Sequence, residues 1–402
     1  MTEPTPFLRR PEVIIAAGCL IALLTFGTRA GFGLYLEPMS SANGWGREIF
    51  AVAIGIQNIM WGLGQPIAGA LADRFGATRV LIVGTLIYFS GFVLMSFADT
   101  PALLHLSAGF LIGIGGAGAS FGLVMAAVGR MVPDSKRSMA LGIIVASSSL
   151  GQFLLVPTGQ AFIMAYGWST ALVLTGSLLL FVIPLSAPFS RNDQASGTHI
   201  EQTLSQALRE ASRHRSYVLL TLGFFVCGYH VAFIQTHLPA YIQDQGVDAW
   251  VGGWAIALVG LFNIVGSLTS GWLGGFWSKK KLLSLIYLAR AIVIAIYVTL
   301  PVTATTTLVF AGAMGLLWLS TVPATSGLIA LMFGPRYMAT LFGIVFLSHQ
   351  VGAFIGVWLG GYLFDLMGTY NYVWWSGVGL GLVAALLHWP IVERPVARLA
   401  PT

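Results

Sequence analysis

Two arginines lie deep inside long apolar segments of this chain, Arg29 in the segment 13–39 and Arg290 in the segment 282–301. No Asp or Glu lies at comparable depth. A charged side chain in the middle of a membrane-embedded segment costs about 3 kcal/mol or more, so it persists where something compensates it. Because a guanidinium offers a planar fork of donors that matches a carboxylate, the two arginines predict an anionic ligand that binds and leaves.

Both arginines also have a purely structural interpretation. Arg29 could bond to backbone carbonyls or Tyr hydroxyls and only brace neighbouring helices. Arg290 lies about 8 residues into its segment, or roughly 12 Å at 1.5 Å per residue, where its long side chain could also reach towards the surface. Both interpretations stay open at this stage, and both residues are candidates for substrate binding.

The composition is that of an integral membrane protein. Of the 402 residues, 56% are hydrophobic and 8% are charged, whereas a soluble domain carries about 25% charged residues. The net charge of +6 reflects where a membrane protein keeps its positive residues, so no nucleic-acid partner is expected. Cys19 and Cys227 lie in apolar segments without metal-ligand spacing, and we expect no metal or other cofactor.

A segment that crosses a bilayer as a helix needs about 20 apolar residues. Breaks marked by charge, Gly and Pro divide the chain into twelve such segments, which predicts an all-α integral membrane fold with two six-helix halves, 1–189 and 216–402. A polar segment, 190–215, joins the halves and contains a helix-like run. The predicted spans are 13–39, 49–72, 78–98, 102–130, 138–165, 167–188, 216–243, 249–276, 282–301, 305–333, 339–366 and 371–392.

The basic residues indicate how these spans are oriented. Apart from Arg29 and Arg290, every Lys and Arg falls on one side of the membrane in this count, except Arg47. Positive residues concentrate on the cytoplasmic side of membrane proteins. The pattern therefore predicts a multi-pass membrane protein with cytoplasmic N- and C-termini and a cytoplasmic segment 190–215.

The two halves repeat in sequence. The run that begins Gly27-Thr28-Arg29 aligns with the run that begins Gly228-Tyr229-His230, at an offset of 201 residues. His230 thus occupies the repeat position of Arg29, and an imidazole titrates near neutral pH, which makes His230 a candidate proton carrier. His349 is a second candidate, and the alternative for both is a fixed hydrogen-bonding role.

One motif carries a family resemblance. The run Gly69-Ala-Leu-Ala-Asp73-Arg74-Phe-Gly76-Ala-Thr-Arg79 lies between the second and third spans. It resembles the loop signature G-x-L-x-D-R-x-G-x-x-R/K of the major facilitator superfamily. The resemblance implies that the acid and base latch helix ends on the cytoplasmic side, while the glycine permits a tight turn.

Within that superfamily the chain is similar to the bacterial branch near monocarboxylate and oxalate:formate porters. The similarity rests on Gly223 to Tyr241 and on Phe346 to Gly352. Those porters carry an Arg in span eight, where this chain offers Asn263, and the oxalate porter carries a Lys in span eleven, where this chain has His349. The substrate is therefore not inherited from these relatives.

The resemblance also implies which spans line a central cavity, namely 1, 4, 7 and 10 with 2, 5, 8 and 11. Polar residues on those spans join the arginines as substrate-binding candidates, and most such residues act as interhelical contacts worth about 1 kcal/mol each. The candidates are Arg29, Arg290, Asn58, Gln152, Tyr229, His230, Asn263 and Gln350.

Together these features predict a secondary transporter of a small organic anion, a mono- or dicarboxylate, that works by alternating access in the lipid bilayer. His230 or His349 could couple proton movement to transport, and the coupling partner stays open between a proton, sodium and a second anion. A monomer is the expectation for the family. An enzyme is not expected, because no nucleophile–base constellation is visible. Two alternatives stay open: a proton-driven exporter of a drug or toxic compound, and a membrane sensor that binds a solute without transporting it.

Overall fold

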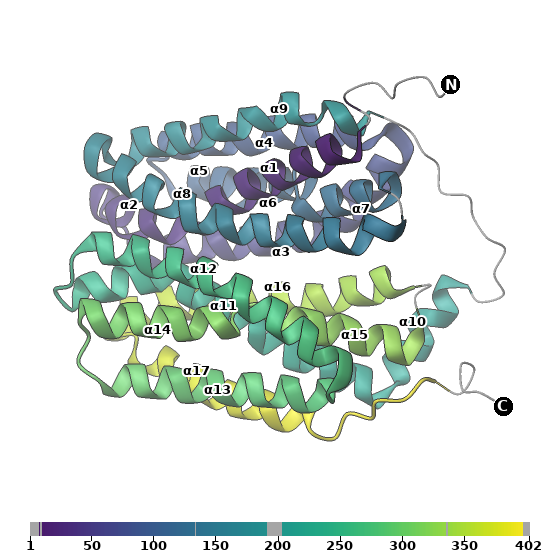
Figure 1. Cartoon of the computed structure of the whole chain (residues 1–402). Helices are drawn as coiled ribbons and strands as arrows, with labels where there is room; N and C mark the ends of the chain where they lie inside the picture. Colours follow the sequence, from purple (N-terminus) through teal and green to yellow (C-terminus); the bar gives the residue numbers. More distant parts are fainter. Residues whose placement is uncertain (1–7, 9, 133, 191–202, 335–336, 397–402) are drawn as a thin grey trace.

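The computed structural model describes residues 8, 10–132, 134–190, 203–334 and 337–396. It is a bundle of helices in two halves, with α1 to α9 in one half and α11 to α17 in the other (Figure 1). No β-strand occurs within the described ranges. The all-α prediction is therefore confirmed.

The helices of the N-terminal half follow one another with short connections, and single 3-10 or π-helical turns are labelled η. Their bounds are α1 (Pro11–Ala30), η2 (Phe32–Tyr35), α2 (Leu36–Asn43), α3 (Arg47–Phe75), α4 (Ala77–Ser96), α5 (Pro101–Leu104), η3 (His105–Leu111), α6 (Ile112–Gly118), α7 (Phe121–Met131), α8 (Asp134–Ser177), η4 (Leu178–Phe181), α9 (Val182–Leu185) and η5 (Ala187–Phe189).

The C-terminal half follows a surface helix, α10, which lies in the predicted polar segment and begins with a capping box at Thr203. Residues 191–202 of that segment lie outside the described residues. The bounds are α10 (Leu204–Arg213), α11 (Arg215–Asp244), α12 (Ala249–Phe276), α13 (Lys279–Thr299), α14 (Ala304–Leu317), α15 (Thr321–Phe333), α16 (Met338–Met367) and α17 (Asn371–His388).

Nine helical runs among the described residues have the length and hydropathy of a membrane span. One of them, Met139–Leu185, contains two predicted spans, because α8 turns back at Gly167, whose φ of 76° favours glycine. The more polar α3 and the 18-residue α17 are the remaining two predicted spans. The nine runs together with α3 and α17 thus correspond to the twelve predicted spans.

The outer surface of the bundle is apolar. Met164 and Trp272 are each 69% exposed and Leu386 is 72% exposed, on three different helices. A water-soluble protein rarely exposes so many large apolar side chains together. This surface is suited to contact with lipid.

Spans four and ten are broken near their middles, where the sequence predicted continuous helices at 102–130 and 305–333. Span four changes from α6 to α7 at Ala119 and Ser120, and the Ser120 hydroxyl caps α7 by accepting a bond from the Leu123 N–H at 3.2 Å. Span ten changes from α14 to α15 at residues 318–320. Hydropathy predicts that a segment is buried in lipid, and it does not report a short break whose polar groups find partners inside the protein.

The halves contact each other through α3 with α16 and through α8 with α12. Small residues allow the close approach: a Cβ added at Gly55 of α3 would lie 2.6 Å from the Phe354 ring of α16. The Gln235 side chain of α11 also donates to the Ala30 carbonyl of α1 at 3.1 Å. These contacts set the relative position of the two halves.

Candidate functional site

Arg29 lies in the last turn of α1, where a cation interacts favourably with the negative end of the helix dipole. Its Nη2 donates to the Asn58 Oδ1 of α3 at 2.5 Å, and its guanidinium carbon lies 4.2 Å from the centre of the Trp61 ring. The side chain is partly buried, and its Nε has no hydrogen-bond partner among the described residues. Asn58 and Trp61 therefore hold the guanidinium while leaving donors free for a ligand.

The residues that face Trp61 come from the other half. Phe346 of α16 meets the Trp61 ring edge to face at 5.3 Å, and His349 stacks on Phe346 at 5.7 Å between ring centres. His349 Nδ1 lies 3.1 Å from Gln350 Oε1. We call these residues the central site, and its members are Arg29, Asn58, Trp61, Phe346, His349 and Gln350.

The central site thus combines one cation, two aromatic walls and a histidine at the boundary of the halves. A Cβ added at Gly62 would lie 2.9 Å from the Gln350 Cγ, so α3 and α16 are close at this level. A guanidinium of this kind can hold a carboxylate, aromatic faces can hold an apolar body, and an imidazole can exchange a proton. Trp61 and Phe346 were not among the predicted binding residues. Trp61 follows Asn58 by one helical turn, and this spacing places both on one face of α3, which the sequence could have indicated.

Gln152 and Asn263 lie where α8 contacts α12. The Gln152 Nε2 donates to the Ile256 carbonyl at 2.8 Å, and the Asn263 Nδ2 donates to the Ser149 hydroxyl at 2.9 Å. Both side chains are nearly fully buried. In this conformation these two predicted site residues join the halves and are not brought into the central site.

Tyr229 and His230 face α17 and not Arg29. The Tyr229 hydroxyl lies 2.5 Å from the Ser376 hydroxyl, and the His230 Nε2 lies 2.7 Å from the Gly377 carbonyl. Both side chains are 1% exposed. His230 therefore shares the repeat position of Arg29 in the sequence but has a different environment.

Arg290 lies on α13 and is fully buried. Its Nη2 and Nε donate to the Leu317 carbonyl at 2.7 and 3.2 Å, and Nη2 also donates to the Trp318 carbonyl. The Arg290 guanidinium thus contacts backbone oxygens at the break in span ten. The bracing interpretation describes this arrangement, and the structure does not bring Arg290 to the central site.

The predicted loop motif forms the turn between α3 and α4. Gly76 has a φ of 90°, in the region that favours glycine, and it ends α3. Asp73, Arg74 and Arg79 are exposed beside this turn, and Gly69 lies earlier on α3, where an added Cβ would meet nothing within 4 Å. The glycine turn expected from the motif is therefore present.

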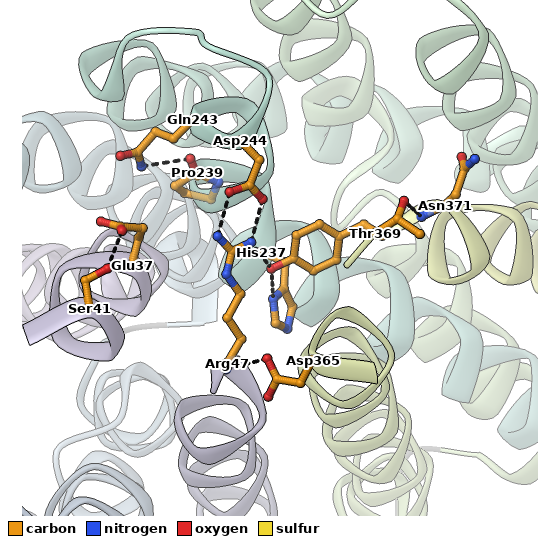
Figure 2. Close-up of polar contacts among 11 residues, drawn as sticks. Glu37, Ser41, Arg47, His237, Pro239, Gln243, Asp244, Asp365, Thr369 and Asn371 are labelled. Carbon is orange, nitrogen blue, oxygen red and sulfur yellow. Dashed lines mark hydrogen bonds and ion pairs between the residues drawn. The ribbon is translucent and has the colours of Figure 1, made fainter. Parts of the chain in front are cut away.

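A network of charges joins the halves at the end of the bundle where α3 begins and α11 ends (Figure 2). Arg47 of α3 forms a bidentate ion pair with Asp244 of α11, with N–O distances of 2.6 and 2.7 Å, and donates to the Tyr370 hydroxyl at 2.9 Å. Asp365 of α16 accepts from the backbone N–H groups of Arg47 and Glu48 at 2.8 and 2.7 Å. We call this the Arg47 network.

The Arg47 network was not predicted as a site, although the sequence did single out Arg47 as the one basic residue on its side of the membrane. Further contacts support the network. The Arg47 guanidinium carbon lies 3.8 Å from the centre of the Phe364 ring, and the Tyr370 hydroxyl lies 3.0 Å from the His237 Nδ1. Asp365 caps the N-terminus of α3, and Asp244 pairs with the Arg47 side chain; both carboxylates come from the other half. The network therefore holds this end of the bundle closed.

A family model described as Major Facilitator Superfamily matches residues 18–322 and 253–401. Monocarboxylate transporter 13 of Rattus norvegicus is 27% identical over 373 residues, which cover 89% of this chain and 83% of that protein. The uncharacterized MFS-type transporter YcxA of Bacillus subtilis is 25% identical over 386 residues, which cover 92% of each.

A solved structure with a similar fold is a bacterial homologue of the human lysosomal transporter Spinster, in an inward-facing and occupied conformation. It superposes with a TM-score of 0.76 at 14% identity, over 94% of this chain and 96% of that one. This likeness concerns the fold.

Proposed function

The chain belongs to the Major Facilitator Superfamily, and on that basis we propose that it carries a small organic anion, a monocarboxylate, across a bacterial inner membrane by alternating access. The proposed transport units are the halves 1–189 and 216–402. The relatives named as monocarboxylate transporters support the substrate class.

The observation that carries the proposal is the position of Arg29. Its guanidinium lies between Asn58 and Trp61, opposite Phe346 and His349 of the other half, and no carboxylate among the described residues pairs with it. Alternating-access carriers bind substrate between their halves near the bilayer midplane. Because Arg290 bonds to backbone carbonyls, the central site has one available arginine, which favours a monocarboxylate over a dicarboxylate.

The proposed orientation has both termini in the cytoplasm, because the basic residues concentrate on that side. The Arg47 network then closes the outer end, and the protein is in an inward-facing conformation. Transport requires the Arg47 network to separate when the outer end opens.

His349 is the proposed proton carrier. It stacks on Phe346 at the central site and remains 7% exposed, whereas His230 is 1% exposed and bonded to the Gly377 carbonyl. A histidine changes its charge in the physiological pH range. Proton binding at His349 beside a carboxylate bound to Arg29 would couple the two movements.

Uptake into proteoliposomes tests the proposal directly. A radiolabelled panel of lactate, pyruvate, formate, oxalate and an aromatic acid is offered with and without an inward proton gradient. We expect gradient-driven uptake of a monocarboxylate, and Arg29→Ala should reduce its affinity about 100-fold, since two charge-assisted hydrogen bonds contribute about 3 kcal/mol. The control is Arg209→Ala, which removes an exposed arginine on α10.

The result also separates the alternatives. Uptake that Arg29→Ala leaves unchanged would refute the role of Arg29. Absence of uptake for every acid, together with resistance of overexpressing cells to a toxic compound, would identify an exporter. Tight binding of an acid without flux would identify a solute sensor.

A further inference from the structure

The break in span ten exposes backbone groups that need partners. α14 ends at Leu317 and α15 begins at Thr321, so carbonyls near the end of α14 lack their helical N–H donors. An unpaired polar group in a membrane interior costs several kcal/mol. The way in which these groups are satisfied therefore decides whether the break can exist.

Three side chains from neighbouring helices supply the partners. Arg290 of α13 donates to the carbonyls of Leu317 and Trp318. Asn263 of α12 accepts from the Leu319 N–H at 2.9 Å. The third is Ser270 of α12, whose hydroxyl donates to the Ser320 carbonyl at 2.5 Å. The break is thus held from two sides, by a cation on α13 and by polar groups on α12.

The equivalent break in span four has a different residue at the position that corresponds to Arg290. At the repeat offset of 201 residues, Arg290 corresponds to Phe89. There the Ser120 hydroxyl caps α7 and lies 3.4 Å from the Gln65 Oε1. The break in span four therefore forms with no arginine at the position that corresponds to Arg290.

The charge of Arg290 is compensated by carbonyl dipoles and by an aromatic ring. It is 0% exposed, and no ion pair with a carboxylate is found among the described residues. The negative end of the α14 dipole and the face of the Tyr287 ring, 5.3 Å from the guanidinium carbon, stabilise the charge. The guanidinium and the helix end therefore depend on each other: removing either leaves the other buried and unpaired.

Asn263 connects this break to the other half of the protein. Its Oδ1 accepts from the Leu319 N–H, while its Nδ2 donates to the Ser149 hydroxyl of α8 at 2.9 Å. One amide thus contacts both the break and the N-terminal half. A change in the path of residues 317–320 would move the Leu319 N–H that bonds to the Asn263 oxygen. It would thereby also shift the hydrogen bond from Asn263 to Ser149.

We propose that Arg290 is a positioning residue for transport: it keeps span ten broken at residues 318–320 and thereby holds Asn263 in place against Ser149 across the two halves. Arg290 does not bind the substrate. This inference rests on the proposed transport function for its kinetic consequence, but its structural consequence can be measured without any substrate. The role of Arg290 is to set how readily the two halves break and re-form their contacts during transport.

A double-mutant cycle between Arg290→Gln and Asn263→Ala tests the proposal, because residues that act through one element are not additive. Thermal unfolding of the purified protein is the readout without substrate. We expect the double variant to lose no more in Tm than the more damaging single variant. Arg290→Lys keeps the charge and a donor, so it should lose less, and it completes the cycle if the glutamine variant does not fold.

Ser284→Ala is the matched control. Ser284 lies on α13 with Arg290, but its hydroxyl donates to the Ala385 carbonyl of α17 at 2.7 Å, away from the break. Its loss in Tm should add to that of Asn263→Ala. Additive losses in the Arg290–Asn263 cycle would overturn the proposal.

Uptake kinetics give the second readout, with the carboxylate identified by the uptake panel. Arg290→Lys and Asn263→Ala should lower the maximal rate at least tenfold and leave KM within about twofold, whereas Arg29→Ala should raise KM. A rise in KM for Arg290→Lys would show substrate contact and overturn the proposal. If no carboxylate is transported, the proposed function fails, and the thermal cycle still decides the role of Arg290.

Discussion

The Arg47 network gives the sharpest test of the conformational cycle, through Asp244→Asn. The substitution removes the negative charge that meets Arg47 at 2.6 and 2.7 Å. The Arg47 and Asp244 side chains are 10% and 28% exposed, so the pair lies between an exposed and a buried one. Exposed pairs contribute about 0–1 kcal/mol, and breaking buried pairs costs about 3–5 kcal/mol.

A loss of about 2 kcal/mol is therefore expected for the end of the bundle that the Arg47 network closes, because Arg47 keeps the Tyr370 hydroxyl and the Phe364 ring. The ion pair joins different halves, so it contributes only while that end is closed. A loss of about 2 kcal/mol changes the equilibrium between conformations about 30-fold. A minor population of about 3% in which this end is open would rise to about half.

Distances between spin labels near the Arg47 network measure this change. Labels on Ser41→Cys of α2 and Asn371→Cys of α17 report on the two halves, because both positions are exposed. Cys19 and Cys227 are first replaced by serine, so that only the introduced cysteines are labelled. We expect a second, longer distance in Asp244→Asn. The control Asp99→Asn removes an exposed carboxylate between α4 and α5. An unchanged distance distribution in a folded Asp244→Asn protein would refute the reasoning.

Two further predictions concern single residues. His349→Gln should abolish the stimulation of uptake by an inward proton gradient, whereas His230→Gln should retain it, because His230 bonds to a backbone carbonyl away from the central site; equal loss in both would contradict the assignment. Gly76→Ala should lower stability by about 1–3 kcal/mol, because its φ of 90° strains any residue with a Cβ, and a thermal midpoint equal to that of the unchanged protein would argue against this strain.

Much of the fold could be predicted from hydropathy, because the thickness of a bilayer fixes the length of a span and lipid requires its apolar composition. The two predicted spans that the structure breaks, 102–130 and 305–333, show the limit of this argument. A break at residues 318–320 depends on Arg290 and Asn263 from other helices. Hydropathy along one segment carries no information about such partners.

Four of the predicted site residues, Arg29, Asn58, His349 and Gln350, lie together at the central site. His230 and Arg290 could not be assigned to their environments from sequence, because the rotation of a helix about its axis decides which neighbour a side chain meets. A fully apolar helix gives no periodic signal from which that rotation can be inferred.

The sequence by itself determined the membrane class, the twelve spans, the internal repeat and the glycine turn at Gly76, since each follows from local composition or from one chain position. The tertiary structure alone decided which charges meet. Arg47 pairs with Asp244, 197 residues away, and its backbone N–H bonds to Asp365, 318 residues away. Ion pairs and hydrogen bonds act over a few ångströms, so they depend on how distant helices pack and not on their order along the chain.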